Sequence, residues 1–106
     1  MDFSQYQELA MRTAPAQASV TAVDQLVAVA GLTGEAGEVA ELFKKKYGHN
    51  KTFDSKDLSK ELGDVLWYLT RICQLNGLDL GQVAQGNIEK LKARYPEGFV
   101  QGGGNR

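Results

Sequence analysis

The chain has 106 residues and a net charge of -1, so its length predicts one domain and its charge balance gives no indication of nucleic-acid binding. No run of about 18 apolar residues is present, which excludes a transmembrane helix, and the polar stretch from Met1 to Ala10 is not expected to act as a signal peptide. Cys73 is the only cysteine, so no internal disulfide can form, and the chain suits a reducing cytoplasm. Because Cys73 lies in an apolar pattern, we expect its thiol to be buried.

The first element in chain order is a short predicted helix. Asp2 and Gln5 have the spacing of a capping box at its start. Pro15 is expected to end the helix near Ala14, because the residue before a proline is pushed out of the α region. Residues 16–20 then form a connector.

A second, long helix is predicted to begin at Thr21 or Asp24 and to run to Tyr47, with Gly48 as the residue that ends it. Its interior holds three glycines spaced three residues apart, although each glycine in a helix interior costs about 1 kcal/mol relative to alanine. These are Gly31, Gly34 and Gly37. Their spacing indicates that another helix or a ligand approaches this backbone closely, and tight helix packing alone would also explain them.

A third helix is predicted to be capped by Asp54 or Ser55 and to run to Asn76, with Gly77 as the residue that stops it. Trp67 and Tyr68 follow Asp64 by three and four residues, so both aromatic side chains border the face of the helix that carries this carboxylate. Aromatic residues at such positions are usually part of a packed core. Here they could instead offer a stacking surface for a nucleotide base.

A fourth helix is predicted from a capping box that begins at Asp79 to Tyr95, where Pro96 ends it. Polar and basic side chains recur along one of its faces at i, i+3 and i+7, a pattern that by itself describes a solvated surface. These are Asn87, Lys90 and Arg94. The domain is expected to span residues 1–98, and the glycine-rich residues 99–106 are expected to form a disordered tail.

Two acidic pairs, each spaced i, i+3, lie on the second and third predicted helices. They are Glu35 with Glu38, and Glu61 with Asp64. Residues three apart share a helix face, so antiparallel packing of the two helices would bring four carboxylates to one seam. Two unit charges about 4 Å apart repel by about 4 kcal/mol at an effective dielectric constant of about 20, so such a cluster needs a cation or must take up protons. A hard divalent ion fits, and Mg²⁺ is the usual choice where phosphates are also bound.

With these residues the sequence resembles the MazG-like, all-α nucleoside triphosphate pyrophosphohydrolases. The family pattern is an E-x-x-E pair, a spacer and an E-x-x-D pair, which stand here in the contexts GLTGEAGEVAELF and SKELGDVLWYL. The stretch NIEKLKARYPEGF also resembles the segment that closes many members, so the match covers roughly residues 22–99. The resemblance implies an all-α fold in which four-helix protomers form an oligomeric bundle, as a dimer or a tetramer. Self-association is also expected because a thin protomer cannot cover its own apolar stripes.

The same resemblance implies Mg²⁺-dependent hydrolysis of a (deoxy)nucleoside triphosphate to the monophosphate and pyrophosphate, with Mn²⁺ as a substitute ion and nucleotide-pool cleaning as the role. Carried over by position, the metal ligands would be Glu35, Glu38, Glu61 and Asp64. The substrate contacts would be Trp67, Tyr68, Asn87, Lys90 and Arg94, with Lys45 added from a basic stretch. Glu35 or Glu38 would orient the attacking water, and Lys90 would stabilise charge on the leaving pyrophosphate. Lys45 stands where some pyrimidine-specific relatives carry a tryptophan, which argues against a cytosine-type aromatic pocket.

Other classes of protein fit these residues less well. A di-iron carboxylate bundle requires Glu-x-x-His motifs, and the single histidine, His49, lies in the wrong place. Residues 54–61 lack the alternating ligands and the central glycine of a calcium loop. The remaining alternative is a non-catalytic helical interaction module, or a nucleotide sensor that has lost turnover. No nucleic-acid or membrane partner is expected.

Overall fold

The computed structural model describes residues 1–16, 18–99 and 101, and within this part the chain forms helices with no strand beyond one isolated bridge. The helices are α1 (Phe3–Ala10), a 3-10 turn (Met11–Thr13), α2 (Ala22–Gly48), α3 (Ser55–Leu75) and α4 (Leu80–Arg94). The predicted all-α class and its four helices are therefore confirmed. The predicted tail lies mostly outside the described residues. Among the described helices, none combines the length and the apolar character needed to cross a membrane.

Short polar side chains fix where the helices begin. Reciprocal capping boxes form at the starts of α1, α2 and α3, and the Asp79 carboxylate accepts a hydrogen bond from the Gln82 amide at the start of α4. Each cap satisfies a backbone amide that has no partner inside the helix. The sequence left two candidate residues for the caps of α2 and α3, and the structure selects Thr21 and Asp54; the caps at Asp2 and Asp79 stand where they were predicted.

The end of α2 differs from the prediction. The helix runs through Gly48, and the left-handed conformation falls on Asn50, which has a φ of 54°. The Lys51 amide then donates to the Lys45 carbonyl at 2.9 Å and closes the turn. The prediction that Gly48 ends the helix was wrong. Asparagine also tolerates the left-handed region, and Asn50 stands where the chain turns.

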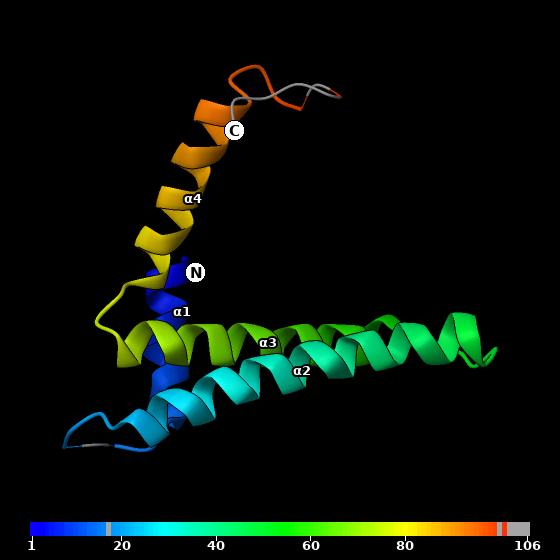
Figure 1. Ribbon diagram of the computed structural model, residues 1–106, viewed down its shortest axis with the longest axis horizontal. Helices are drawn as coiled ribbons and strands as arrows, with labels where there is room; N and C mark the ends of the chain where they lie inside the picture. Colours follow the sequence, from blue (N-terminus) through cyan, green and yellow to red (C-terminus); the bar gives the residue numbers. More distant parts are fainter. Residues whose placement is uncertain (17, 100, 102–106) are drawn as a thin grey trace.

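The centre of the fold is a long hairpin formed by α2 and α3, which lie side by side in Figure 1. The ring of Tyr68 on α3 fills the place that a Cβ atom of Gly31 on α2 would occupy. The close approach predicted at the glycines is thus made at Gly31. At Gly34 and Gly37, no described atom outside the local helix lies within 4 Å of such a Cβ position.

A small core forms where α1 crosses the hairpin. The Trp67 indole donates a hydrogen bond to the Thr13 hydroxyl at 2.8 Å, and Thr70 is fully buried. Cys73 is buried, as predicted, and burial followed by the charge of Asp79 raises the pKa of its thiol. This environment disfavours the reactive thiolate.

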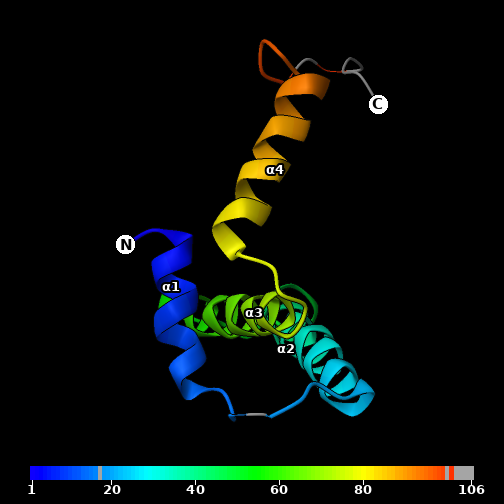
Figure 2. The same cartoon turned by 90° about the vertical axis from the view of Figure 1, so that its left-hand side faces the viewer.

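Helix α4 points away from the hairpin and packs on α1 (Figures 1 and 2). Hydrogen bonds fix the junction: Ser4 donates to Asp79 at 2.9 Å, and Gln7 bonds both Leu78 and Leu80. The radius of gyration is 17.0 Å. A compact domain of about 100 residues has a radius of roughly 13 Å. The protomer is therefore open, and large apolar side chains on α2, α3 and α4 are exposed.

Candidate functional site

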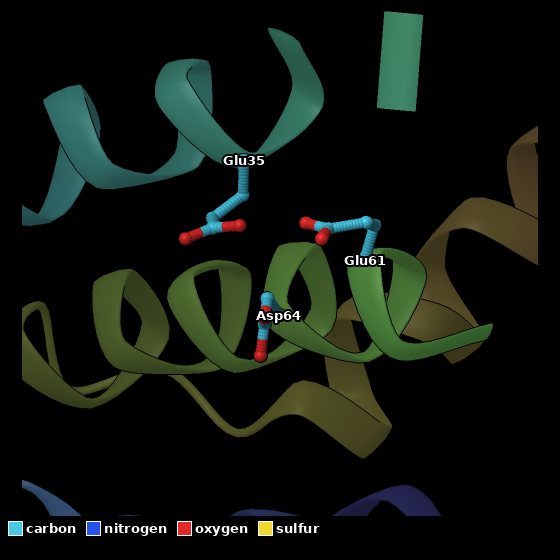
Figure 3. Close-up of side chains that lie close together, drawn as sticks. All are labelled: Glu35, Glu61 and Asp64. Atoms are coloured by element: carbon cyan, nitrogen blue, oxygen red, sulfur yellow. The ribbon is translucent and has the colours of Figure 1, made fainter. Parts of the chain in front are cut away.

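Three carboxylates meet across the seam between α2 and α3 (Figure 3). Glu35 projects from α2 toward Glu61 and Asp64 of α3, and one oxygen atom from each side chain lies within 4.8 Å of the others. Glu61 and Asp64 share a face because they are one helical turn apart. The structure thus brings together three of the four carboxylates that the sequence singles out.

Glu38 stands apart from this group. It lies one turn beyond Glu35 on α2, its side chain is exposed, and it is not one of the three side chains that converge. Its charge nevertheless acts on Glu35, as one of the charges that raise the pKa of that side chain. Glu38 therefore borders the three carboxylates.

The three carboxylates repel one another. Partial burial, followed by the negative charges of Asp64 and Glu61, raises the pKa of Glu35. The charge of Asp64 also adds to the effect of burial in raising the pKa of Tyr6 on α1. Among the described lysines and arginines, Arg12 pairs with Glu8, which lies outside this group of carboxylates. The site is thus a negative centre built from hard oxygen donors, which suits a divalent cation.

A cavity of about 250 Å³ lies one turn along α3 from this centre. Its lining residues come from the connector, α2 and α3: Pro15, Asp24, Val27, Ala28, Trp67, Tyr68 and Arg71. The Trp67 and Tyr68 rings contact edge to face, with centroids 5.0 Å apart. Both aromatic residues therefore pack within the fold, as one reading of the sequence predicted, and both also line a cavity.

The sequence did not single out Asp24 or Arg71 as lining residues. Arg71 is buried and donates to Gln74 at 2.6 Å, and Asp24 takes part in the cap of α2. Arg71 interrupts the apolar run of α3, and an arginine on a buried face was the signal that could have identified it. Asp24 gave no such signal, because its role in the cap already accounts for it.

The predicted phosphate contacts lie elsewhere in the protomer. Asn87, Lys90 and Arg94 are on α4, which makes no extensive contact with α2 or α3. Asn87 and Lys90 are exposed, whereas Arg94 is partly buried and its Nε atom has no hydrogen-bond partner among the described residues. Lys45 is exposed on α2, two turns beyond Glu38. A single protomer therefore does not bring these side chains to the three carboxylates.

Comparison with known proteins identifies relatives of the chain. Residues 24–99 match the family described as the MazG nucleotide pyrophosphohydrolase domain, a range that contains both acidic pairs and all of α4. The Gene 37 protein of Mycobacterium phage L5 is 40% identical over 79 residues, which is 71% of this chain and 69% of the phage protein. No solved structure matches the chain.

Proposed function

The chain belongs to the MazG nucleotide pyrophosphohydrolase family, and on this basis we propose that it hydrolyses a nucleoside triphosphate to the monophosphate and pyrophosphate. The observation that carries the proposal is the meeting of Glu35, Glu61 and Asp64 across the α2–α3 seam. These three side chains would hold a Mg²⁺ ion, with Glu38 at the border of the group; when bound, the ion polarises a phosphate group and makes a bound water more acidic. Mn²⁺ is the proposed substitute because it accepts the same oxygen ligands.

The attacking water requires a group that orients it and accepts its proton. We assign this role to Glu38, because its carboxylate is exposed beside the other three and is not one of the side chains that converge. Glu35 is the second candidate, since its raised pKa moves it toward the range of a general base. Positive side chains are needed for the charge that develops on the leaving pyrophosphate, and we assign Lys90 and Arg94 of a neighbouring copy in the expected oligomer to it, because α4 of the same protomer lies away from the carboxylates. Asn87, on the same face of α4, and Lys45 would contact the phosphates.

The cavity beside the carboxylates is the proposed binding site for the base of the nucleotide. Tyr68 and Trp67 line it and offer aromatic surface for stacking. Along α3, the distance from Asp64 to the residues that line the cavity, Trp67 to Arg71, is about 5–10 Å at 1.5 Å per residue. A nucleotide with its base in the cavity would therefore extend its phosphates toward the carboxylates. Nucleotide-pool cleaning is the biological role that we propose.

The test is pyrophosphate release from a panel of ribo- and deoxyribonucleoside triphosphates, with Mg²⁺ and with a chelator. We expect monophosphate and pyrophosphate only when the metal is present. An analogue with a methylene bridge between the α and β phosphorus atoms should resist hydrolysis, whereas the β,γ-bridged analogue should still be cleaved. Release of orthophosphate, or no turnover of any triphosphate with either Mg²⁺ or Mn²⁺, would refute the proposed reaction.

Divalent metal is expected to stabilise the fold. An ion that binds only the native state adds about 1.4 kcal/mol to the free energy of unfolding at a tenfold excess over its Kd. Thermal unfolding with Mg²⁺ and with a chelator should therefore give different Tm values. A double variant, Glu61→Gln with Asp64→Asn, is the control and should show no such difference. Identical Tm values for the parent, with no heat of Mg²⁺ binding by calorimetry, would count against a metal centre.

A further inference from the structure

Two charged side chains of opposite sign line the cavity beside the carboxylates. Asp24 belongs to the first turn of α2, and Arg71 lies near the end of α3. An ionised carboxylate only accepts hydrogen bonds, and a guanidinium only donates them. The cavity, at about 250 Å³, is smaller than the roughly 300–1,000 Å³ of pockets that enclose a drug-sized ligand. It therefore suits the base of a nucleotide, with the sugar and the phosphates outside.

Contacts within the fold hold both charged side chains in place. The backbone amide and the hydroxyl of Thr21 donate to Oδ2 of Asp24 at 2.8 and 2.9 Å, as part of the cap of α2. Arg71 is 8% exposed, and its Nη1 atom donates to Oε1 of Gln74 at 2.6 Å. Side chains that are already ordered lose little conformational freedom when a ligand binds. Asp24 and Arg71 thus form a preorganised acceptor and a preorganised donor on the wall of the cavity.

The aromatic residues of the cavity offer stacking without selection among bases. The Trp67 indole N–H donates to the Thr13 hydroxyl at 2.8 Å, so this side chain contributes ring surface to the cavity rather than a donor. Tyr68 lies against it, edge to face. Stacking on aromatic side chains tolerates every base, because each base has a π face. A preference among bases must therefore come from the polar groups of the cavity, of which Asp24 and Arg71 carry charge.

The bases differ in how their hydrogen-bonding edges match this pair. Guanine has two adjacent N–H donors, at N1 and N2, and two adjacent acceptors, at O6 and N7. A carboxylate can accept from both donors, and a guanidinium donates to both acceptors in the commonest specific contact of arginine with a base. Adenine and cytosine place a lone pair beside their amino group, and that lone pair repels a carboxylate. Uracil and thymine have a single N–H between two carbonyl groups, so guanine matches the pair best.

We propose that the cavity selects guanine, with Asp24 accepting hydrogen bonds from N1 and N2 and Arg71 donating them to O6 and N7. The preferred substrates are then GTP and dGTP. The inference rests on the proposed function, because it takes the cavity as the site of the base. It adds a specificity that the carboxylate centre cannot supply, since that centre acts on the phosphates, which all nucleoside triphosphates share.

The first test compares kcat/KM for the ribo- and deoxyribonucleoside triphosphates of all the bases. We expect guanine nucleotides to be preferred by about 10-fold or more, the discrimination typical of one well-placed bidentate contact. Inosine triphosphate lacks the N2 amino group and 7-deazaguanosine triphosphate lacks the N7 acceptor, so each loses one contact and should fall below GTP by about 10-fold. Values of kcat/KM that are equal for all bases would overturn the guanine assignment and leave the hydrolysis standing.

Asp24→Asn should reverse a preference in a way that a structural role of Asp24 would not. The asparagine oxygen still accepts from N1, but its amide NH₂ group meets the N2 amino group of guanine, donor against donor. Xanthine carries an oxygen atom in place of that amino group and accepts from the amide. The parent should therefore prefer GTP to xanthosine triphosphate, and the variant should prefer xanthosine triphosphate by about 10-fold or more. A variant that loses both activities equally, or that keeps the parent's preference, would overturn the Asp24 contact.

Asp57→Asn is the matched control. Asp57 has the same position in the capping box of α3 that Asp24 has in that of α2, and it lies outside the described lining of the cavity. The ratio of GTP to xanthosine triphosphate turnover should stay as in the parent. A change in this ratio equal to that of Asp24→Asn would trace the effect to helix capping and would overturn the assignment.

Binding measurements separate this inference from the proposed reaction. Analogues of GTP, ATP, CTP and UTP with a methylene bridge between the α and β phosphorus atoms resist cleavage there, so calorimetry with Mg²⁺ measures their affinity without turnover. We expect the Kd of the guanine analogue to be lower than the others by about 10-fold or more. A parent that binds this analogue most tightly but hydrolyses no triphosphate would refute the proposed function and support the guanine site. Equal Kd values, or no binding of any analogue, would overturn the guanine site.

Discussion

Glu61→Gln and Asp64→Asn are each expected to reduce pyrophosphate release by about 10²-fold or more. Each substitution keeps the shape and much of the hydrogen bonding of the side chain but removes one of the charges that meet at the seam. Loss of a charge that stabilises the transition state costs several kcal/mol of activation free energy, whereas loss of a surface charge costs little. Steady-state pyrophosphate release at saturating Mg²⁺ is the measurement.

Glu89→Gln is the control for this pair of variants. Glu89 lies on α4, is exposed, and accepts a hydrogen bond only from Gln85 at 3.3 Å among the contacts that are resolved. Loss of the Glu89 charge should leave the rate of pyrophosphate release unchanged. If the Glu61, Asp64 and Glu89 variants all release pyrophosphate like the parent, the carboxylate centre is not the site of the reaction.

In the metal-free protein, removal of a carboxylate from the centre should maintain or raise the stability of the fold. Because the folded state raises the pKa of Glu35, its ionised form destabilises the fold at neutral pH. Glu35→Gln should therefore match or exceed the stability of the parent in chelator at pH 7. As the pH falls through the raised pKa, Glu35 takes up a proton, the repulsion is relieved, and the difference between the two proteins should shrink. Urea unfolding at several pH values measures it, and a difference that grows on acidification would contradict the repulsion.

Gly31→Val is expected to lower the free energy of unfolding by about 3 kcal/mol, the upper end of the usual range for an overpacked site. The Tyr68 ring already occupies the place of a Cβ atom at this position, so the new side chain must displace the ring or separate α2 from α3. In a domain of this size such a loss corresponds to a fall in Tm of about 10 °C or more. Differential scanning calorimetry of the chelated protein is the measurement.

Gly86→Ala provides the comparison for this prediction. Gly86 also lies inside a helix, but no described atom stands within 4 Å of its Cβ position. Alanine there should raise the stability by about 1 kcal/mol through its higher helix propensity. If Gly31→Val and Gly86→Ala have equal Tm values, the contact between Gly31 and Tyr68 does not hold the hairpin together.

The sequence predicted those features that depend on neighbouring residues. Thr21 and Asp24 cap α2 through contacts over three positions, and Pro15 follows a residue that leaves the helical region. The spacing of Glu61 and Asp64 placed both carboxylates on the face that meets Glu35, because a short loop forces α2 and α3 to pack as a hairpin. Such features follow from local geometry and need no knowledge of the rest of the fold.

Features that depend on distant segments could not be predicted. The cavity requires Pro15, Val27 and Arg71 to meet, and no periodicity in the sequence relates these three positions. The direction of α4 is set by hydrogen bonds between α1 and the start of α4, at Ser4 and Gln7. The periodicity of α4 identifies its apolar stripe, but it cannot say which surface covers that stripe.

Asp64 and Tyr68 lie on adjacent turns of α3, so this helix fixes the spacing and the relative direction of the two side chains. Inserting one residue between them would rotate Tyr68 by about 100° around the helix axis, away from Gly31 and from the cavity. Substitutions at positions 67 and 68 would leave the spacing between Asp64 and these positions intact. On the proposed function, descendants of this chain can therefore acquire a preference for a new base by substitution. Insertions and deletions in this segment would separate the proposed base site from the proposed metal centre.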